Sequence, residues 1–244
     1  SLLHVPVDLD TEPGLSDEMK TWFAFATQKI EEIVALAERA DGHEDATEAL
    51  FEKSRRAHAA RAESDWINDA AVQDRVAGID ASMTERDSPH SSRSPLQREA
   101  LDLPTLPTTT IGSFPQTDDM RRMRAQYKKD EISKDEYEDF IEEQIADTIA
   151  AQEEIGLDVL VHGEPERGDM VEHFGRQLDG FLFTENGWVQ SYGTRCVRPP
   201  IIAGDVSRPE PMTTRWLSYA NDQTDTPVKG MLTGPVTMLQ WSFV

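Results

Sequence analysis

The 244-residue chain has one cysteine, few basic residues and no long apolar run. Its single cysteine, Cys196, excludes an internal disulfide, and we expect a cytoplasmic protein because disulfide-free chains are typical of reducing compartments. Lysine and arginine number 24 against 46 aspartates and glutamates, and the net charge of −22 argues against nucleic acid or an anionic membrane as partner. No apolar run approaches the roughly 20 residues that cross a bilayer, so the sequence predicts a soluble protein.

The two ends of the sequence look interrupted. The chain opens without methionine in a strand-like run, and it closes at Trp241–Val244 inside an apolar segment that has no stop signal. We therefore expect the chain to be a piece of something larger.

Three stretches differ in character. Residues 1–40 predict a short strand over 1–9 and one helix from Ser16 to Ala40, because apolar residues recur there at three- and four-residue spacing. Residues 41–104 predict helices with thin apolar faces, and they include a linker rich in serine and proline. From residue 105 onward, strand and helix signals alternate, and a glycine-containing turn follows each strand.

This alternation predicts an α/β fold, either a βα barrel or a parallel sheet. Ser133 and Glu136 have the spacing of a capping box before an apolar stripe, so a helix is expected there that ends at Gly156. Asn186–Gly187 lies between two short apolar runs and predicts a hairpin. The predicted strands are Thr108–Ile111, Leu157–Val161, Ile201–Ala203 and Val228–Leu232.

In a barrel the carboxyl ends of all strands meet on one face. The sequence therefore predicts that four strand-end turns lie around one mouth: Ile111–Ser113, Glu164, Asp205 and Gly234–Pro235. A glycine there allows a substrate to approach the backbone, and a serine hydroxyl can donate or accept a hydrogen bond. A carboxylate at Glu164 could bind a substrate ammonium, or it could equally satisfy the N–H groups at a helix N-terminus.

Arg195 and Arg198 form a basic island around Cys196 in a very acidic chain. An anionic ligand would explain the island, and a structural ion pair explains it nearly as well. We do not expect Cys196 to act as a nucleophile, since no histidine lies near it in the sequence. His162 and Glu164 lie close together in the sequence, but no second set of ligands appears, so no metal site is predicted among these residues.

Long motifs in matching order resemble cobalamin-independent methionine synthase. Residues 1–9 also resemble the last strand of that family's first barrel. The motifs are Pro107–Gln116, Leu157–Glu164, Asp169–Glu172, Asn186–Gly193, Arg195–Cys196, Lys229–Thr237 and Trp241–Phe243.

The resemblance implies a methyltransferase that moves a methyl group from 5-methyltetrahydropteroyltri-L-glutamate to the thiol of homocysteine. It assigns the amino-acid part of homocysteine to Ile111, Gly112, Ser113 and Glu164. It assigns the folate to Arg195 and Cys196, and to Trp241, against which the pterin packs. These small molecules are the expected partners. The complete enzyme is expected to be a monomer, whereas this chain could self-associate through an open sheet edge.

The resemblance also implies a fold derived from the (β/α)8 TIM barrel. Residues 1–40 would be the last strand and helix of an N-terminal barrel, 41–104 a helical inter-domain linker, and 105–244 the first half of the C-terminal catalytic barrel. The family's zinc ligands and its proton-donating histidine come from later strands, and none of those motifs occurs here. We therefore expect no catalytic residue and no metal ligand within the chain, and no activity from the chain alone.

Two other functions compete with this interpretation. One is a related thiol methyltransferase barrel, such as a corrinoid-linked enzyme. The other is a non-catalytic truncated fragment or interaction protein. The motifs around Arg195–Cys196 and Trp241 favour the synthase over a related barrel, because they correspond to the folate contacts.

Overall fold

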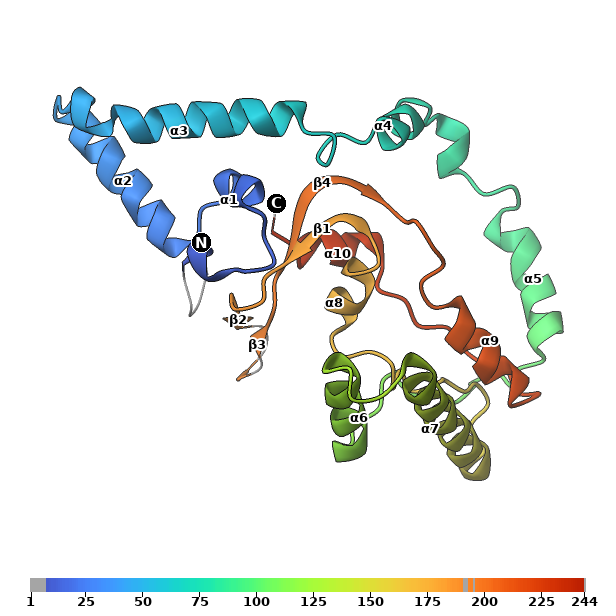
Figure 1. Cartoon of the computed structure of the whole chain (residues 1–244). Helices are drawn as coiled ribbons and strands as arrows, with labels where there is room; N and C mark the ends of the chain where they lie inside the picture. The colour runs from blue at the N-terminus through green and yellow to red at the C-terminus, as the bar shows by residue number, and fades with distance from the viewer. Residues whose placement is uncertain (1–7, 191–192, 195, 244) are drawn as a thin grey trace. The chain divides into compact units, whose positions relative to one another are not determined.

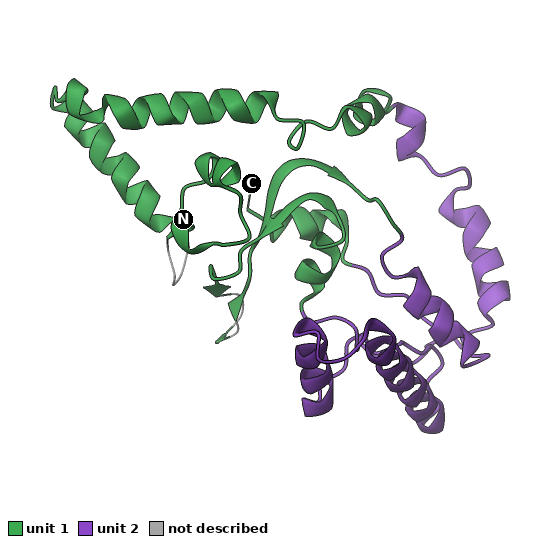
Figure 2. Ribbon diagram, viewed as in Figure 1, with its two compact units in different colours: residues 1–79, 169–210, 233–244 green, residues 80–168, 211–232 purple. Residues whose placement is uncertain are grey.

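A computed structural model describes residues 8–190, 193–194 and 196–243. The chain separates into two compact units, each assembled from distant segments (Figure 2). Unit 1 comprises Ser1–Ile79, Asp169–Glu210 and Thr233–Val244, and unit 2 comprises Asp80–Gly168 and Pro211–Leu232. Most of the predicted strand over residues 1–9 lies outside the described residues, and the predicted division at residues 40 and 104 stays a prediction.

Both units combine helices with short extended segments (Figure 1). No described helix is both long enough and apolar enough to cross a membrane. The helical elements of unit 1 are η1 (Leu9–Thr11), α1 (Asp17–Trp22), α2 (Ala26–Ala40), α3 (Glu44–Glu63), α4 (Ala70–Ala77), α8 (Met170–Gly175) and α10 (Pro235–Gln240). Those of unit 2 are η2 (Ala81–Thr84), α5 (His90–Leu101), α6 (Asp118–Lys128), α7 (Lys134–Ile155) and α9 (Thr214–Asp222).

The single helix predicted from Ser16 to Ala40 is wrong, because the structure has two helices there. Ser16 does cap α1, and its hydroxyl accepts the N–H of Met19 at 3.2 Å. The backbone then becomes extended at Phe23, with φ −117° and ψ 157°. This break turns Phe25 into a small core with Leu9 and Leu15, where Phe25 is only 4% exposed. Burial of a large aromatic ring there outweighs the helical periodicity.

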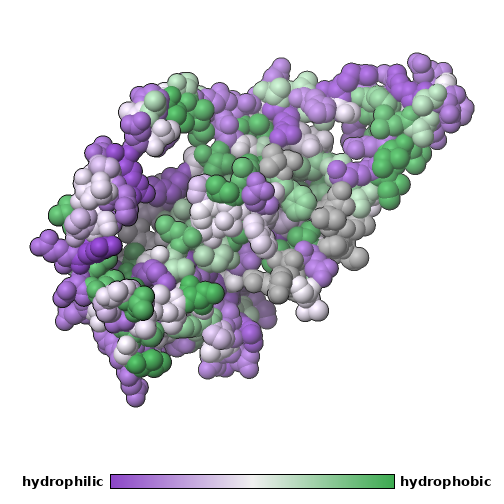
Figure 3. Space-filling view, turned by 180° about the vertical axis from the view of Figure 1, so that it is seen from behind, coloured by the Kyte–Doolittle hydropathy of each residue, from purple (hydrophilic) through white to green (hydrophobic). Residues whose placement is uncertain are grey.

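The apolar face predicted for α2 is exposed in the described structure. Ile30, Ile33 and Val34 are 63%, 65% and 49% exposed, and hydrophobic residues gather over this arm in the space-filling view (Figure 3). Ala35, on another side of the helix, is buried. The periodicity therefore identified a helix but not the face on which it packs within this chain.

Two antiparallel strand pairs form the extended part of unit 1. The strand β1 (Asp179–Phe183) pairs with β4 (Pro200–Ser207), and β2 (Val189–Gln190) pairs with β3 (Cys196–Val197). The hairpin predicted across Asn186–Gly187 is therefore wrong, since its two runs pair with other segments. The reason is a contact with a distant part of the chain: the N–H groups of Glu185, Asn186 and Gly187 all donate to the buried Glu12 carboxylate.

The β4 strand is longer than predicted and runs antiparallel to its partner. The sequence predicts a strand that ends at Ala203, whereas the structure continues it to Ser207 past an irregularity between Asp179 and Phe181. Gly180 has φ +80° at this irregularity, and an added Cβ would lie 2.3 Å from the carbonyl oxygen of Asp205. Only glycine permits this approach of the two backbones.

Unit 2 is built on α7 and three parallel segments. The capping box at Ser133 and Glu136 is confirmed, and α7 ends at Gly156 in the left-handed conformation, as predicted. One face of α7 buries Ile141, Ile145 and Ile149 against Leu160 and Ala220. Isolated parallel bridges join Thr109 to Val159, Ser113 to Gly163, and Leu160 to Val228.

These bridges place three of the predicted strands next to one another in parallel, although they are short. Mixed helices and parallel segments agree with the predicted α/β class, while the barrel arrangement stays a prediction.

Candidate functional site

The candidate site of unit 2 lies where the three parallel segments end. Ser113 pairs with Gly163, and the N–H of Phe114 donates to the carbonyl of Gly163 at 3.0 Å. The third segment joins through the N–H of Lys229, which donates to the carbonyl of Leu160 at 2.8 Å. The predicted turns at 111–113 and at 164 are thus neighbours, and Met231 follows the end of the third segment.

Gly112 is the point at which these turns come closest. It has φ +130°, and a Cβ added to it would lie 2.7 Å from the Met231 methyl carbon and 3.0 Å from Glu164 Oε1. A side chain at this position would therefore displace both neighbours. Ser113 is exposed beside it, so its hydroxyl is accessible to a ligand. Ile111 turns its side chain outward at 81% exposure, so only its backbone can contribute to the floor of the site.

Glu164 is buried at the end of its strand in an uncommon conformation. Its φ of +60° is unusual for a residue with a side chain, and the residue is only 3% exposed. Burial raises the pKa of its carboxyl group, and the nearby Arg167 guanidinium offsets part of that effect. Arg167 Nη1 lies 3.7 Å from Glu164 Oε2, which is longer than a charge-assisted hydrogen bond.

Three further ionisable residues lie near Glu164, namely His162, Glu166 and Arg167, and they were not predicted to be part of the site. Arg167 Nε donates to Glu166 Oε1 at 2.7 Å, and His162 Nε2 lies 3.1 Å from the same oxygen. Because a carboxylate only accepts, this contact places a hydrogen on Nε2. Burial opposes ionisation of Glu166, but the hydrogen bond with His162 and the charges of His162 and Arg167 lower its pKa to about 2.

A sequence signal for this network does exist. His162, Glu164, Glu166 and Arg167 directly follow a strand of apolar residues, so their side chains enter a buried region. Buried charges must be paired, and a run of alternating acidic and basic residues at such a strand end therefore indicates a network.

Helix α7 fixes the strand that carries Glu164. The side chain of Gln152 is buried and mimics a neighbouring strand: its Nε2 donates to the carbonyl of Val161 at 2.7 Å, and its Oε1 accepts the N–H of Val161 at 3.0 Å. The next residues in this strand are His162, Gly163 and Glu164. The carboxylate is thus presented from a rigid element.

The charges of this network favour a cationic ligand. The two carboxylates share the Arg167 guanidinium, which lies 2.7 Å from Glu166 and 3.7 Å from Glu164. The Glu164 carboxyl group is buried beside exposed Ser113, and Arg167 lies beyond the distance of a charge-assisted hydrogen bond from it. An ammonium group would complete the pairing, while the N–H groups and hydroxyl of the turn suit a carboxylate.

The predicted folate residues belong to unit 1. Arg195 lies outside the described residues. Cys196 is exposed in β3, and Trp241 follows α10 at 52% exposure. The Arg198 guanidinium lies 4.9 Å from the centre of the Trp188 ring and 3.9 Å from the Glu172 carboxylate. A structural ion pair, rather than an anionic ligand, therefore accounts for this arginine.

Asp205 has a structural role within unit 1. Its carboxylate accepts the backbone N–H of Asp69 and the side-chain amide of Gln73, each at 3.0 Å, and thereby attaches the start of α4 to β4. Gly234, the other expected turn, caps α10. The structure describes both turns in unit 1, whereas Gly112 and Glu164 belong to unit 2.

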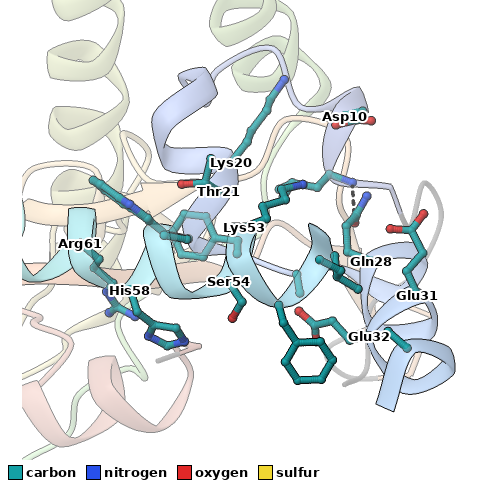
Figure 4. Close-up of a pocket in the computed structure, with 18 of the residues that line it drawn as sticks. Asp10, Lys20, Thr21, Gln28, Glu31, Glu32, Lys53, Ser54, His58 and Arg61 are labelled. Atoms are coloured by element: carbon teal, nitrogen blue, oxygen red, sulfur yellow. Dashed lines mark hydrogen bonds between the residues drawn. The ribbon is translucent and has the colours of Figure 1, made fainter. Parts of the chain in front are cut away.

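A hollow of about 640 Å³ lies elsewhere in unit 1, among α1, α2 and α3 (Figure 4). None of the described site candidates lines it. Acidic Glu31 and Glu32 come from α2, and basic Lys53 and Arg61 come from α3. Its walls thus carry both signs of charge and select no ligand class. In the described part of the chain, no three His, Cys, Asp or Glu side chains gather as a metal site would require.

Comparisons with known proteins agree on one family. A family model described as the catalytic domain of cobalamin-independent synthase matches residues 106–244. The 5-methyltetrahydropteroyltriglutamate–homocysteine methyltransferases of Caulobacter vibrioides and Mesorhizobium japonicum are 55% and 56% identical over the whole chain. The chain covers 31% of each, so it spans about a third of the length of these curated relatives.

A solved structure is more distantly similar. The B12-independent methionine synthase from Shewanella sp. W3-18-1, in complex with selenomethionine, matches 57% of this chain and 40% of its own. The two are 22% identical with a TM-score of 0.46.

Proposed function

We propose that this chain, which belongs to the family of the cobalamin-independent synthase catalytic domain, supplies the homocysteine-binding part of a methyltransferase. The reaction would transfer a methyl group from 5-methyltetrahydropteroyltriglutamate to homocysteine, as the names of the relatives say of those proteins. The observation that carries the proposal is the buried Glu164 carboxylate beside Gly112 and Ser113.

Each polar group of homocysteine would have a partner in this arrangement. Glu164 would pair with the ammonium, and the desolvated setting would strengthen that pairing. The turn at Ile111–Ser113 would bind the carboxylate through backbone N–H groups and the Ser113 hydroxyl. Gly112 supports this role because the absence of a side chain lets Glu164 Oε1 and Met231 lie close to the turn.

Residues Arg195, Cys196 and Trp241 are proposed to contact the methyl donor. The exposed Trp241 ring could stack on the pterin, and Arg195 would add a positive charge for an anionic cofactor. Zinc, which activates the thiol in the family, does not fit the described part of this chain, because no group of ligand side chains gathers there. We therefore propose substrate binding as the role of this chain.

Calorimetric titration with two ligands tests the role of Glu164. The ligands are L-homocysteine and 4-mercaptobutyrate, which has the same thiol and carboxylate but no ammonium. We expect the wild-type chain to prefer homocysteine by about tenfold or more, as befits a desolvated charge pair. Glu164→Gln should abolish this preference, while Glu143→Gln, on the exposed face of α7, should keep it. Equal affinities for both ligands in the wild type would contradict the proposal.

A further inference from the structure

Arg167 joins three parts of the candidate site through one guanidinium. Its Nε donates to Glu166 Oε1 at 2.7 Å, and its Nη1 donates to the carbonyl of Met231 at 2.8 Å. The same Nη1 lies 3.7 Å from Glu164 Oε2. Arg167 is only 3% exposed, so these contacts are shielded from water. One side chain therefore connects the Glu164 strand end to the end of the third parallel segment.

The backbone on either side of the Arg167 side chain is also fixed by hydrogen bonds. Arg124 Nη2, from α6, donates to the carbonyl of Pro165 at 2.7 Å and to that of Arg167 at 3.2 Å. Gln116 Nε2 donates to the same Arg167 carbonyl at 3.2 Å. Arg167 is thus held both at its backbone and at its guanidinium, and the surrounding structure sets the distance between the guanidinium and Glu164.

The unequal distances have a chemical consequence. A direct arginine–carboxylate pair closes to about 2.7–2.9 Å and occupies the carboxylate oxygens. Glu166 has this close contact, whereas Glu164 does not. Arg167 therefore lowers the electrostatic cost of a buried charge on Glu164 and still leaves that carboxylate open to a second cation.

We propose that Arg167 is a positioning residue for the amino-acid substrate: anchored by Glu166 and by the Met231 carbonyl, it holds the Glu164 carboxylate charged but unoccupied. Glu166 acts as a restraint that keeps the guanidinium from closing onto Glu164. The inference rests on the proposed role of Glu164 as the ammonium partner.

Arginine suits this role and lysine does not. A planar guanidinium directs several N–H groups toward fixed acceptors, whereas an ammonium is a single point charge on a flexible chain. Arg167→Lys therefore preserves the charge and removes the geometry. The charged groups that face Glu164 are Arg167, His162 and Glu166. From the adjoining segments, Lys229 Nζ donates to the carbonyl of Thr110 at 2.8 Å.

Two charge-conserving variants test the proposal, and they should shift the pKa of the Glu164 carboxyl group in opposite directions. Arg167→Lys withdraws the nearby guanidinium, so the Glu164 pKa should rise and homocysteine should bind about tenfold more weakly. Glu166→Asp shortens the restraint by one methylene, so Arg167 should close onto Glu164. The Glu164 pKa should then fall, and homocysteine binding should again weaken.

The measurements are calorimetric affinity as a function of pH and NMR titration of the Glu164 carboxyl carbon without ligand. Arg122→Lys is the matched control, since Arg122 forms an exposed ion pair with Asp119 on α6. A merely structural role would lower the melting temperature of both variants but leave the Glu164 pKa unchanged, and that result would overturn the proposal. If Arg167→Lys does not fold, an unchanged affinity and pKa in Glu166→Asp would overturn it equally.

The two measurements also separate this proposal from the proposed function. If the wild-type chain does not discriminate homocysteine from 4-mercaptobutyrate, the ammonium role of Glu164 fails. The ligand-free titration then still decides whether Arg167 and Glu166 set the Glu164 pKa in opposite directions.

Discussion

At the scale of single residues, Glu166 shows how pairing overcomes burial. Its carboxyl group lies in a buried network, yet His162 and Arg167 lower its pKa from the usual 4.5 to about 2. A carboxyl group whose pKa is lower in the folded state stabilises that state above its unfolded pKa. This contribution disappears as the pH falls from about 4.5 toward 2, and it amounts to roughly 3 kcal/mol at neutral pH.

We predict that Glu166→Gln removes this part of the acid sensitivity. The free energy of unfolding of the wild type, measured with urea at pH 7 and near pH 2.5, should fall by more than that of the variant, because glutamine has no proton to bind. Glu143→Gln should retain the wild-type dependence on pH, since Glu143 is exposed on α7. Parallel stability curves for the wild type and Glu166→Gln would contradict the assigned network.

Gly112 gives a second prediction at this scale. Alanine at Gly112 or at Gly156 must adopt a positive φ, and in the left-handed conformation of Gly156 this costs about 1–2 kcal/mol. The two sites differ in space, because an added Cβ meets nothing within 4 Å at Gly156 but meets Met231 and Glu164 at Gly112. Gly112→Ala should therefore lose more stability than Gly156→Ala in thermal melts, and only Gly112→Ala should lose homocysteine affinity. An unimpaired affinity in Gly112→Ala would remove Gly112 from the site.

Part of this site could be predicted from the sequence for a clear physical reason. Gly112, Ser113 and Glu164 end predicted strands, and parallel strands bring their ends together. Sequence reasoning considered His162 only as a possible metal ligand and assigned no role to Glu166 or Arg167, which lie beyond the end of the strand, where the alternation of side chains stops. Glu164 itself has φ +60°, so alternation no longer determines where its neighbours point.

At the scale of elements, single contacts decide where helices and hairpins end. Glu12 is fully buried, and its carboxylate accepts the N–H groups of Glu185 and Gly187 at 2.6 Å each. This contact turns the Asn186–Gly187 segment away from a two-residue hairpin. The sequence could not reveal it, because Glu12 and Gly187 are far apart in the chain. Helix caps, by contrast, depend on neighbouring residues, and those at Ser16, Ser133 and Gly156 were predicted correctly.

We predict that Glu12→Gln destabilises unit 1 by roughly 2 kcal/mol, because the amide would replace a charged acceptor of several N–H groups and turn a donor toward some of them. Urea unfolding followed by tryptophan fluorescence would measure this loss. Glu38→Gln, at an exposed position of α2, should leave the midpoint of urea unfolding unchanged. The Glu12 contact would be irrelevant to stability if the two variants unfolded alike.

At the scale of the whole molecule, the length of the chain and the residues expected to bind substrate bear on what the chain can do alone. It spans about a third of the length of its curated relatives. The predicted substrate residues are present, whereas the described residues offer no cluster of metal ligands. The apolar residues of α2 that the helical periodicity predicts to be buried are exposed in the described structure. The predicted parallel strands are joined only by isolated bridges among the described residues.

We predict that the purified chain does not transfer methyl groups. Supplied with zinc, homocysteine and 5-methyltetrahydropteroyltriglutamate, it should produce no methionine above a blank, measured by mass spectrometry. The purified chain should still bind homocysteine, so the experiment distinguishes loss of turnover from loss of binding. Sustained turnover would show that the chain contains chemistry that we have not assigned to it.

The most direct measurement of the central claim is the ¹⁵N–¹H NMR spectrum of the chain during titration with L-homocysteine. We expect the amide signals of Gly112 and Ser113 to shift in a saturable way in the wild type and to stay unchanged in Glu164→Gln. Saturable shifts that leave both of these amides unaffected, or shifts that persist in Glu164→Gln, would contradict the assignment of the homocysteine site.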